Sequence, residues 1–68
     1  MVEIKIGDWV KTPRFCKVKI SAILANNTQA REFGYTEGTD FQDENWSIKG
    51  RIIGENRMEF AAIRQDGK

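Results

Sequence analysis

Two stretches of alternating apolar and polar residues, at positions 18–35 and 48–62, most constrain what this chain of 68 residues can fold into. Each stretch has a short polar segment flanked by side chains that alternate between an apolar and a polar face, as in a β-hairpin. Matching faces fix the register of a hairpin, because a slip of one residue would turn every apolar side chain to water. The sequence therefore predicts a small all-β protein.

The first predicted hairpin turns at Asn26-Asn27, because asparagine tolerates the left-handed backbone angles of a two-residue turn. Its first strand presents one apolar face, made by Cys16, Val18, Ile20, Ala22 and Leu24. The predicted apolar pairs across this hairpin are Val18 with Tyr35 and Ile20 with Phe33. A helix here would hold Asn26, Asn27 and Thr28 in its interior, where such residues are unfavourable, so no helix is predicted.

The second predicted hairpin turns through Glu55-Asn56-Arg57, with Asn56 in the left-handed conformation. The apolar face of its first strand is made by Trp46, Ile48, Gly50 and Ile52. The expected pairs are Gly54 with Met58, Ile52 with Phe60 and Gly50 with Ala62. This stretch therefore supplies the last two strands.

The first strand is predicted at residues 2–6, where apolar and charged residues alternate, and residues 9–11 continue it in extended form until Pro13. Residues 37–45 are predicted as a polar surface loop. Five strands in so short a chain favour a single domain over residues 1–68, an antiparallel sheet curled into a partly open barrel. A plain curled meander is the alternative topology.

The string Ile6-Gly7-Asp8-Trp9-Val10, followed by a loop with a proline, resembles the opening of small SH3-like barrels, including KOW and Tudor-type modules. The resemblance covers these five residues and the general spacing of the strands. It implies a binding module without catalysis that serves nucleic-acid machinery or binds peptides. It also implies that the loop after Val10 lies near a binding surface.

The net charge of +1 conceals a strong segregation of charge along the chain. Residues 1–31 carry six bases and two acids, a balance of +4, whereas residues 32–48 carry five acids and no base, a balance of −5. Such a chain can present a basic face and an acidic loop to a charged partner.

A basic surface on neighbouring strands is the first candidate site, assigned to Lys5, Trp9, Arg14, Lys17 and Lys19, with Lys11 and Phe15 beside them. Aromatic rings among cations suit a single-stranded nucleic acid, whose bases stack while its phosphates pair with the charges. The competing reading is a solvated outer face with Trp9 packed at the edge of the core.

The acidic loop is the second candidate site, for a protein partner or a second copy of the chain, and is assigned to Phe41, Asp43, Glu44 and Trp46. Aromatic residues are favoured anchors in interfaces, and the acids would steer a basic partner. In the competing reading, Trp46 is the first core residue of its strand and Phe41 covers one end of the barrel.

Catalysis is not expected, because the chain has no His, a single Cys and no glycine-rich phosphate motif. Cys16 is predicted as a reduced thiol packed as a small hydrophobe. No cofactor or metal is expected, since the spacing of the acids at 37–44 does not match a calcium loop. With no apolar run of membrane length and no signal peptide, a cytoplasmic location is expected and a membrane partner is not.

We therefore expect a non-catalytic binding module that acts on a nucleic acid, or on a protein that handles one, through the basic face. The alternatives are a protein-interaction or oligomeric module of the kind that phages and mobile elements carry, using the acidic loop, and a small-ligand binder that uses the pocket of an oligomer.

Overall fold

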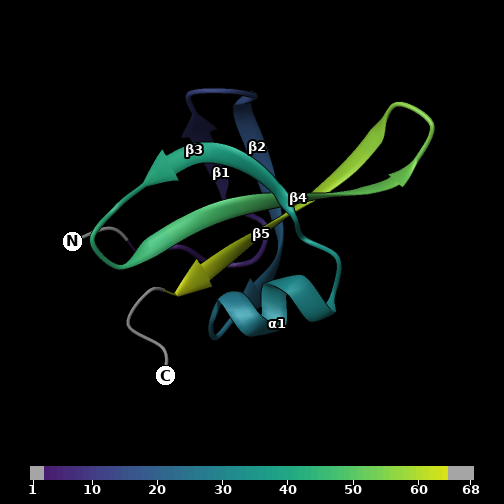
Figure 1. The fold of residues 1–68 in the computed structure, drawn as a ribbon. Coiled ribbons are helices and arrows are strands. Elements are labelled where there is room, and N and C mark those ends of the chain that lie inside the picture. The colour runs from purple at the N-terminus through teal and green to yellow at the C-terminus, as the bar shows by residue number, and fades with distance from the viewer. Residues whose placement is uncertain (1–2, 65–68) are drawn as a thin grey trace.

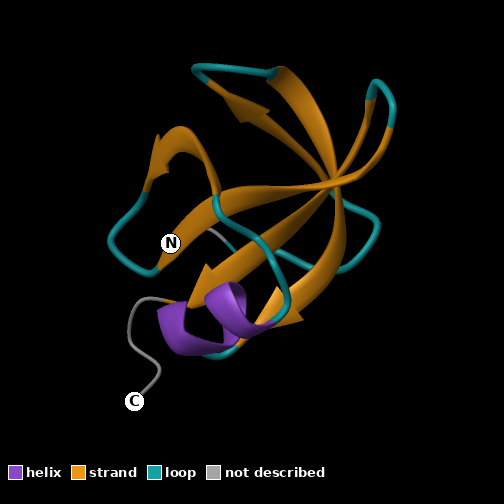
Figure 2. Cartoon of the chain, turned by 45° about the vertical axis from the view of Figure 1, so that its right-hand side comes forward, coloured by secondary structure: helices purple, strands orange, loops and turns teal. Residues whose placement is uncertain are grey.

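The computed structural model describes residues 3–64, which form five strands and one short helix (Figure 1). The elements in chain order are β1 (Trp9–Thr12), β2 (Cys16–Leu24), α1 (Asn27–Glu32), β3 (Glu37–Gln42), β4 (Trp46–Gly54) and β5 (Arg57–Arg64). The strands lie in the order β1-β2-β5-β4-β3 in one sheet. Figure 2 shows this sheet curled into a half-barrel, so the predicted all-β class is confirmed.

The sheet is mixed rather than wholly antiparallel. β3, β4 and β5 form an antiparallel meander, and β1 pairs antiparallel with β2, but β2 joins β5 in parallel. The two outer strands come together near the β1–β2 turn, where the Arg14 backbone N–H donates to Thr39 O at 3.3 Å and its Nη1 donates to Gly38 O at 3.0 Å. These bonds link the open edges of the half-barrel.

The β4–β5 hairpin confirms the second predicted hairpin, and Asn56 has the expected positive φ of 60°. The predicted register is wrong by two residues: Met58 pairs with Ile52, Phe60 with Gly50 and Ala62 with Ile48. A shift of two residues leaves each side chain on its predicted face. Trp46, Ile48 and Gly50 are accordingly buried, whereas Ile52 is exposed.

The predicted hairpin at Asn26-Asn27 is wrong, because the chain forms α1 at this point. Asn26 is the N-cap: its side-chain oxygen accepts from Gln29 N at 2.9 Å, and Gln29 Oε1 accepts in return from Ala25 N at 3.0 Å. The predicted pairs of this hairpin do not form. Val18 instead pairs with Val10 of β1, and Ile20 with Phe60 of β5.

Two further predictions fail at the edges of the sheet. Residues 3–5 form no strand, and a turn follows in which Asp8 N donates to Lys5 O and Asp8 Oδ2 accepts from Lys5 N, both at 3.0 Å. Position 2 of that predicted strand lies outside the described residues. The predicted loop at 37–45 contains β3, which pairs with β4 despite its polar sequence.

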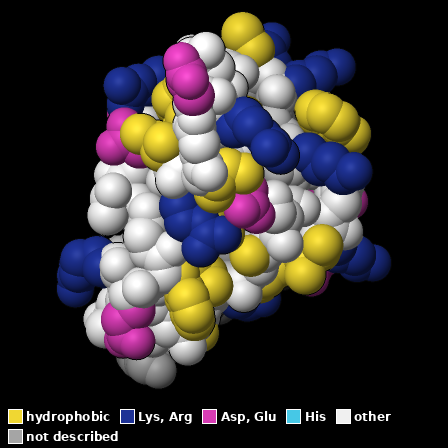
Figure 3. All heavy atoms as spheres, turned by 90° about the vertical axis from the view of Figure 1, so that its right-hand side faces the viewer, with side chains coloured by type: hydrophobic (Ala, Val, Ile, Leu, Met, Phe, Trp, Pro, Cys, Tyr) yellow, Lys and Arg dark blue, Asp and Glu magenta, His cyan; other side chains and the backbone are white. Residues whose placement is uncertain are grey.

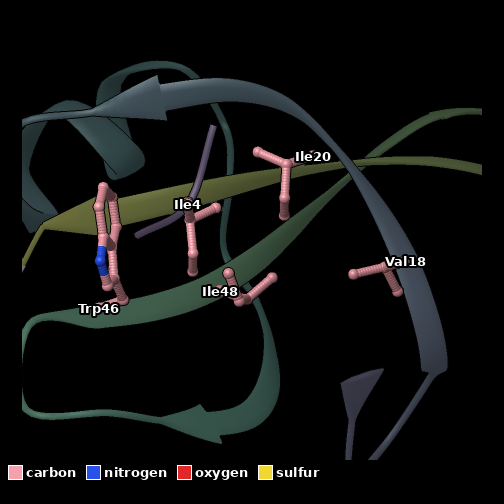
Figure 4. Close-up of a cluster of buried hydrophobic side chains, with 6 residues drawn as sticks. Ile4, Val18, Ile20, Trp46 and Ile48 are labelled. Atoms are coloured by element: carbon pink, nitrogen blue, oxygen red, sulfur yellow. The ribbon is translucent and has the colours of Figure 1, made fainter. Parts of the chain in front are cut away.

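The core consists of two clusters of buried side chains, one on each side of the curled sheet. The larger cluster is drawn in Figure 4 and contains Ile4, Val18, Ile20, Trp46, Ile48 and Ala62. The second contains Leu24, Ala30, Tyr35, Ala61 and Ile63, and it packs α1 against β2 and β5. Burial of these apolar side chains is the main stabilising contribution in so small a protein.

Candidate nucleic-acid interface

The β1–β2 hairpin gathers three lysines and a tryptophan on its outer face. Trp9 lies directly opposite Lys19, and Lys11 opposite Lys17, while Val10 and Val18 form the pair between them. Because side chains alternate along a strand, the first two pairs share one face. We call this surface the cationic face and define it by Trp9, Lys11, Lys17 and Lys19.

All four side chains of the cationic face are exposed, and the Trp9 residue retains 66% of its accessible surface. Within residues 3–64, no ammonium group of the three lysines lies within ion-pair distance of a carboxylate. Like charges directly opposite each other destabilise a sheet, so the Lys11–Lys17 pair costs the hairpin some stability. A bound anion would relieve this repulsion.

A hollow of about 460 Å³ adjoins the cationic face beside Trp9. It is lined by Glu3, Ile4, Asp8, Trp9, Val10, Lys11 and Phe41. Its wall combines aromatic and aliphatic side chains with the carboxylates of Glu3 and Asp8 and the Lys11 side chain. Trp9 and Lys11 therefore belong both to the cationic face and to the wall of a partly apolar recess.

The structure divides the basic residues that the sequence grouped together. It brings Trp9, Lys17 and Lys19 onto one face and adds Lys11, which the sequence placed beside the set. Arg14 is drawn away from this face, since its guanidinium bonds to Gly38 O and lies 5.2 Å from the centre of the Phe15 ring. Lys5 is exposed in the turn before β1 and is not part of the paired face.

The residues of the predicted acidic site do not form a common surface. Trp46 is only 2% exposed and packs in the larger core cluster, with the Arg64 guanidinium 5.0 Å from its ring centre. Phe41 is half-buried against the same cluster, as in the reading that placed both aromatics in or over the core. Trp46 is therefore not available as an anchor for a partner.

The loop between β3 and β4 satisfies its own polar groups. Asp43 Oδ1 accepts from Asn45 N at 3.1 Å, and Asp43 N donates to Trp46 O at 3.0 Å. The Asp43 carboxylate thus shapes the turn, while Glu44 points to solvent. Among the described residues, no three Asp, Glu or Cys side chains come together in a group that could hold a metal ion.

Cys16 differs from its prediction, because it is exposed rather than packed in the core. It lies where the β1–β2 turn enters β2 and has a positive φ of 59°. Its carbonyl accepts from Thr12 Oγ1 at 2.9 Å, and the same hydroxyl accepts from Phe15 N at 3.1 Å. The alternation that begins at Val18 therefore does not extend back to Cys16.

Comparisons of the chain with protein families, with curated proteins and with solved structures gave no match. Over residues 3–64, no helix reaches the length and apolar character that a bilayer crossing requires.

Proposed function

We propose that the protein binds single-stranded nucleic acid through the cationic face. The observation that carries this proposal is the register of the β1–β2 hairpin, which sets an exposed tryptophan across from one lysine and next to a pair of others. Lysines on neighbouring strands would follow the phosphates, and Trp9 would stack on a base. The hollow beside Trp9 offers room for the stacked ring.

The half-barrel is compatible with an SH3-like fold, and a module of the KOW or Tudor type would fit this proposal. The string Ile6-Gly7-Asp8-Trp9-Val10 leads into β1, and the turn that contains Pro13 follows. Such modules bind without catalysis, and the residues of the cationic face have the chemistry of binding rather than of bond cleavage. A cytoplasmic protein with this activity would act on RNA or on transiently opened DNA.

The test is a titration of fluorescein-labelled oligo(dT) with the protein, followed by anisotropy at several salt concentrations. Each phosphate contact on a single strand contributes about 0.7 to the slope of log K against log salt. Three lysines therefore predict a slope of about −2, and each change of Lys11, Lys17 or Lys19 to Gln should reduce its magnitude by about 0.7.

Trp9→Ala separates stacking from charge. Loss of one stacked base should cost about 1–3 kcal/mol of binding free energy and leave the salt slope unchanged. Arg31→Gln is the matched control for charge, because Arg31 is exposed on α1, which lies at the opposite end of β2 from the β1–β2 turn (Figure 1). Absence of binding at low salt, or equal losses from Arg31→Gln and the lysine variants, would contradict the proposal.

A further inference from the structure

The β4–β5 hairpin extends beyond the rest of the sheet, as Figure 1 shows at its right-hand side. We call residues 51–59 the overhanging hairpin. The stripe that carries core residues Trp46 and Ile48 along β4 continues through Gly50 to Ile52, but Ile52 is 65% exposed. The apolar stripe therefore extends from the core to a segment that no other described part of the chain covers.

This inner face of the overhanging hairpin is shaped as an apolar groove of about 450 Å³. It is lined by Ile52, Gly54, Asn56, Arg57, Met58 and Phe60. Gly50 allows Met58 and Phe60 to lie flat here, because a Cβ at position 50 would stand 2.5 Å from Met58 Cε. Figure 3, which faces the hairpin end, shows hydrophobic side chains exposed among Lys and Arg side chains.

The overhanging hairpin also has an unpaired edge. β2 joins β5 only from Phe60 onward, so among the described residues the segment Arg57, Met58 and Glu59 has a strand partner on the β4 side alone. Unpaired edges with apolar side chains readily accept a further strand. The strand that fits best must match the charges on either side of Met58.

Those charges are self-complementary. In an antiparallel pair of two identical segments centred on Met58, Arg57 of each copy faces Glu59 of the other, and the two Met58 residues face each other. A parallel pair would instead set Arg57 against Arg57 and Glu59 against Glu59, which is unfavourable. The sequence of this edge therefore selects a second copy in the antiparallel orientation, which is a two-fold arrangement.

We infer that the protein forms a symmetric dimer in which the β5 edges of two overhanging hairpins pair across a two-fold axis at Met58. The pairing joins the two apolar grooves, so Ile52, Met58 and Phe60 of both copies are removed from water together. Glu59 can take part because its bond to Arg51 Nη2, of 3.0 Å, uses only Oε1. The other carboxylate oxygen then faces Arg57 of the second copy.

The first test is sedimentation equilibrium over a wide range of protein concentration, without nucleic acid. Arg57→Glu sets like charges against each other twice in the dimer and should raise its dissociation constant about tenfold or more. Arg31→Glu makes the same change of charge on α1 and should leave the dissociation constant unchanged. Met58→Lys, which sets two lysines at the axis, should give a monomer with an unaltered far-ultraviolet circular dichroism spectrum.

A cross-linking test places the axis. In a Cys16→Ser background, the thiols of Met58→Cys would lie about 4.5–5.5 Å apart by Cα, within the range of a disulfide, and should join two copies in oxidised glutathione. The matched control Glu55→Cys lies in the turn of the hairpin, away from the proposed axis, so its two copies should not cross-link.

The inference is supported by a dimer that weakens with Arg57→Glu and cross-links at position 58. It is overturned if the protein stays monomeric at millimolar concentration. A monomer whose hairpin binds a different protein overturns it in the same way. A dimer that tolerates both Arg57→Glu and Met58→Lys, or that cross-links equally at position 55, overturns it as well. None of these measurements depends on nucleic-acid binding. A result against the dimer therefore does not bear on the proposed binding of nucleic acid, which the oligo(dT) titration tests separately.

Discussion

At the scale of single residues, Thr39 shows how the curled sheet tolerates an irregular edge strand. The regular pairing of β3 with β4 is interrupted between Gly38 and Gln42, where Asp40 has a positive φ of 61°. Thr39 is fully buried there, and its hydroxyl donates to Ile48 O at 2.6 Å. A side-chain hydroxyl thus replaces a ladder bond that the bulge removes.

Thr39→Val tests this role. Valine keeps the shape of the side chain but leaves the buried Ile48 carbonyl without its donor, so the free energy of unfolding should fall by about 1–3 kcal/mol. Urea denaturation gives the measurement, and Thr36→Val, at an exposed position, is the matched control. An equal effect of the two substitutions would show that the Thr39 hydroxyl contributes nothing of its own.

The sequence could not reveal β3, because the residues of this strand are not typical of strands. Glu37, Gly38 and Asp40 are residue types depleted in strands, and the buried member of the segment is a threonine rather than a large apolar residue. Strand formation here follows from tertiary pairing with β4. By contrast, the outward orientation of Lys17 and Lys19 was predictable, because strict alternation around Val18 and Ile20 is a local signal.

At the scale of elements, α1 depends on its cap more than on an apolar face. The helix has six residues, and Ala30 is the buried one among them, so helical periodicity is too short to detect in the sequence. The signal that could have identified it is Asn26 followed three residues later by Gln29, immediately after an apolar strand. Asn26 and Asn27 also fit the two-residue turn of a hairpin, and the prediction based on that turn is wrong.

Asn26→Ala and Asn27→Ala distinguish these two interpretations. Loss of the Asn26 cap should lower the free energy of unfolding by about 1 kcal/mol, because Gln29 N loses its acceptor. Asn27 is an exposed residue of the helix, and alanine there should be neutral or stabilising. Thermal unfolding of both variants gives the comparison. A larger loss for Asn27→Ala would favour the hairpin turn over the helix.

At the scale of the whole molecule, the parallel pairing of β2 with β5 decides where the surfaces lie. After β2 the chain forms α1 instead of a neighbouring strand. β2 therefore pairs with β1 on one side and with β5 on the other. This arrangement presents the cationic face on β1 and β2, while β4 and β5 extend together as the overhanging hairpin. No local pattern predicts a pairing between strands so distant in sequence, so the parallel contact of β2 with β5 required the structure, whereas the cationic face belongs to the local β1–β2 hairpin.

The most direct test of the proposed function is a ¹⁵N–¹H correlation spectrum of the protein, recorded at low salt while oligo(dT) is added. We predict shifts at the Trp9 indole N–H and at the backbone amides of Lys11, Lys17 and Lys19, with the amides of α1 unmoved. Shifts confined to residues 43–46 or to the overhanging hairpin, or no shifts at all, would contradict it.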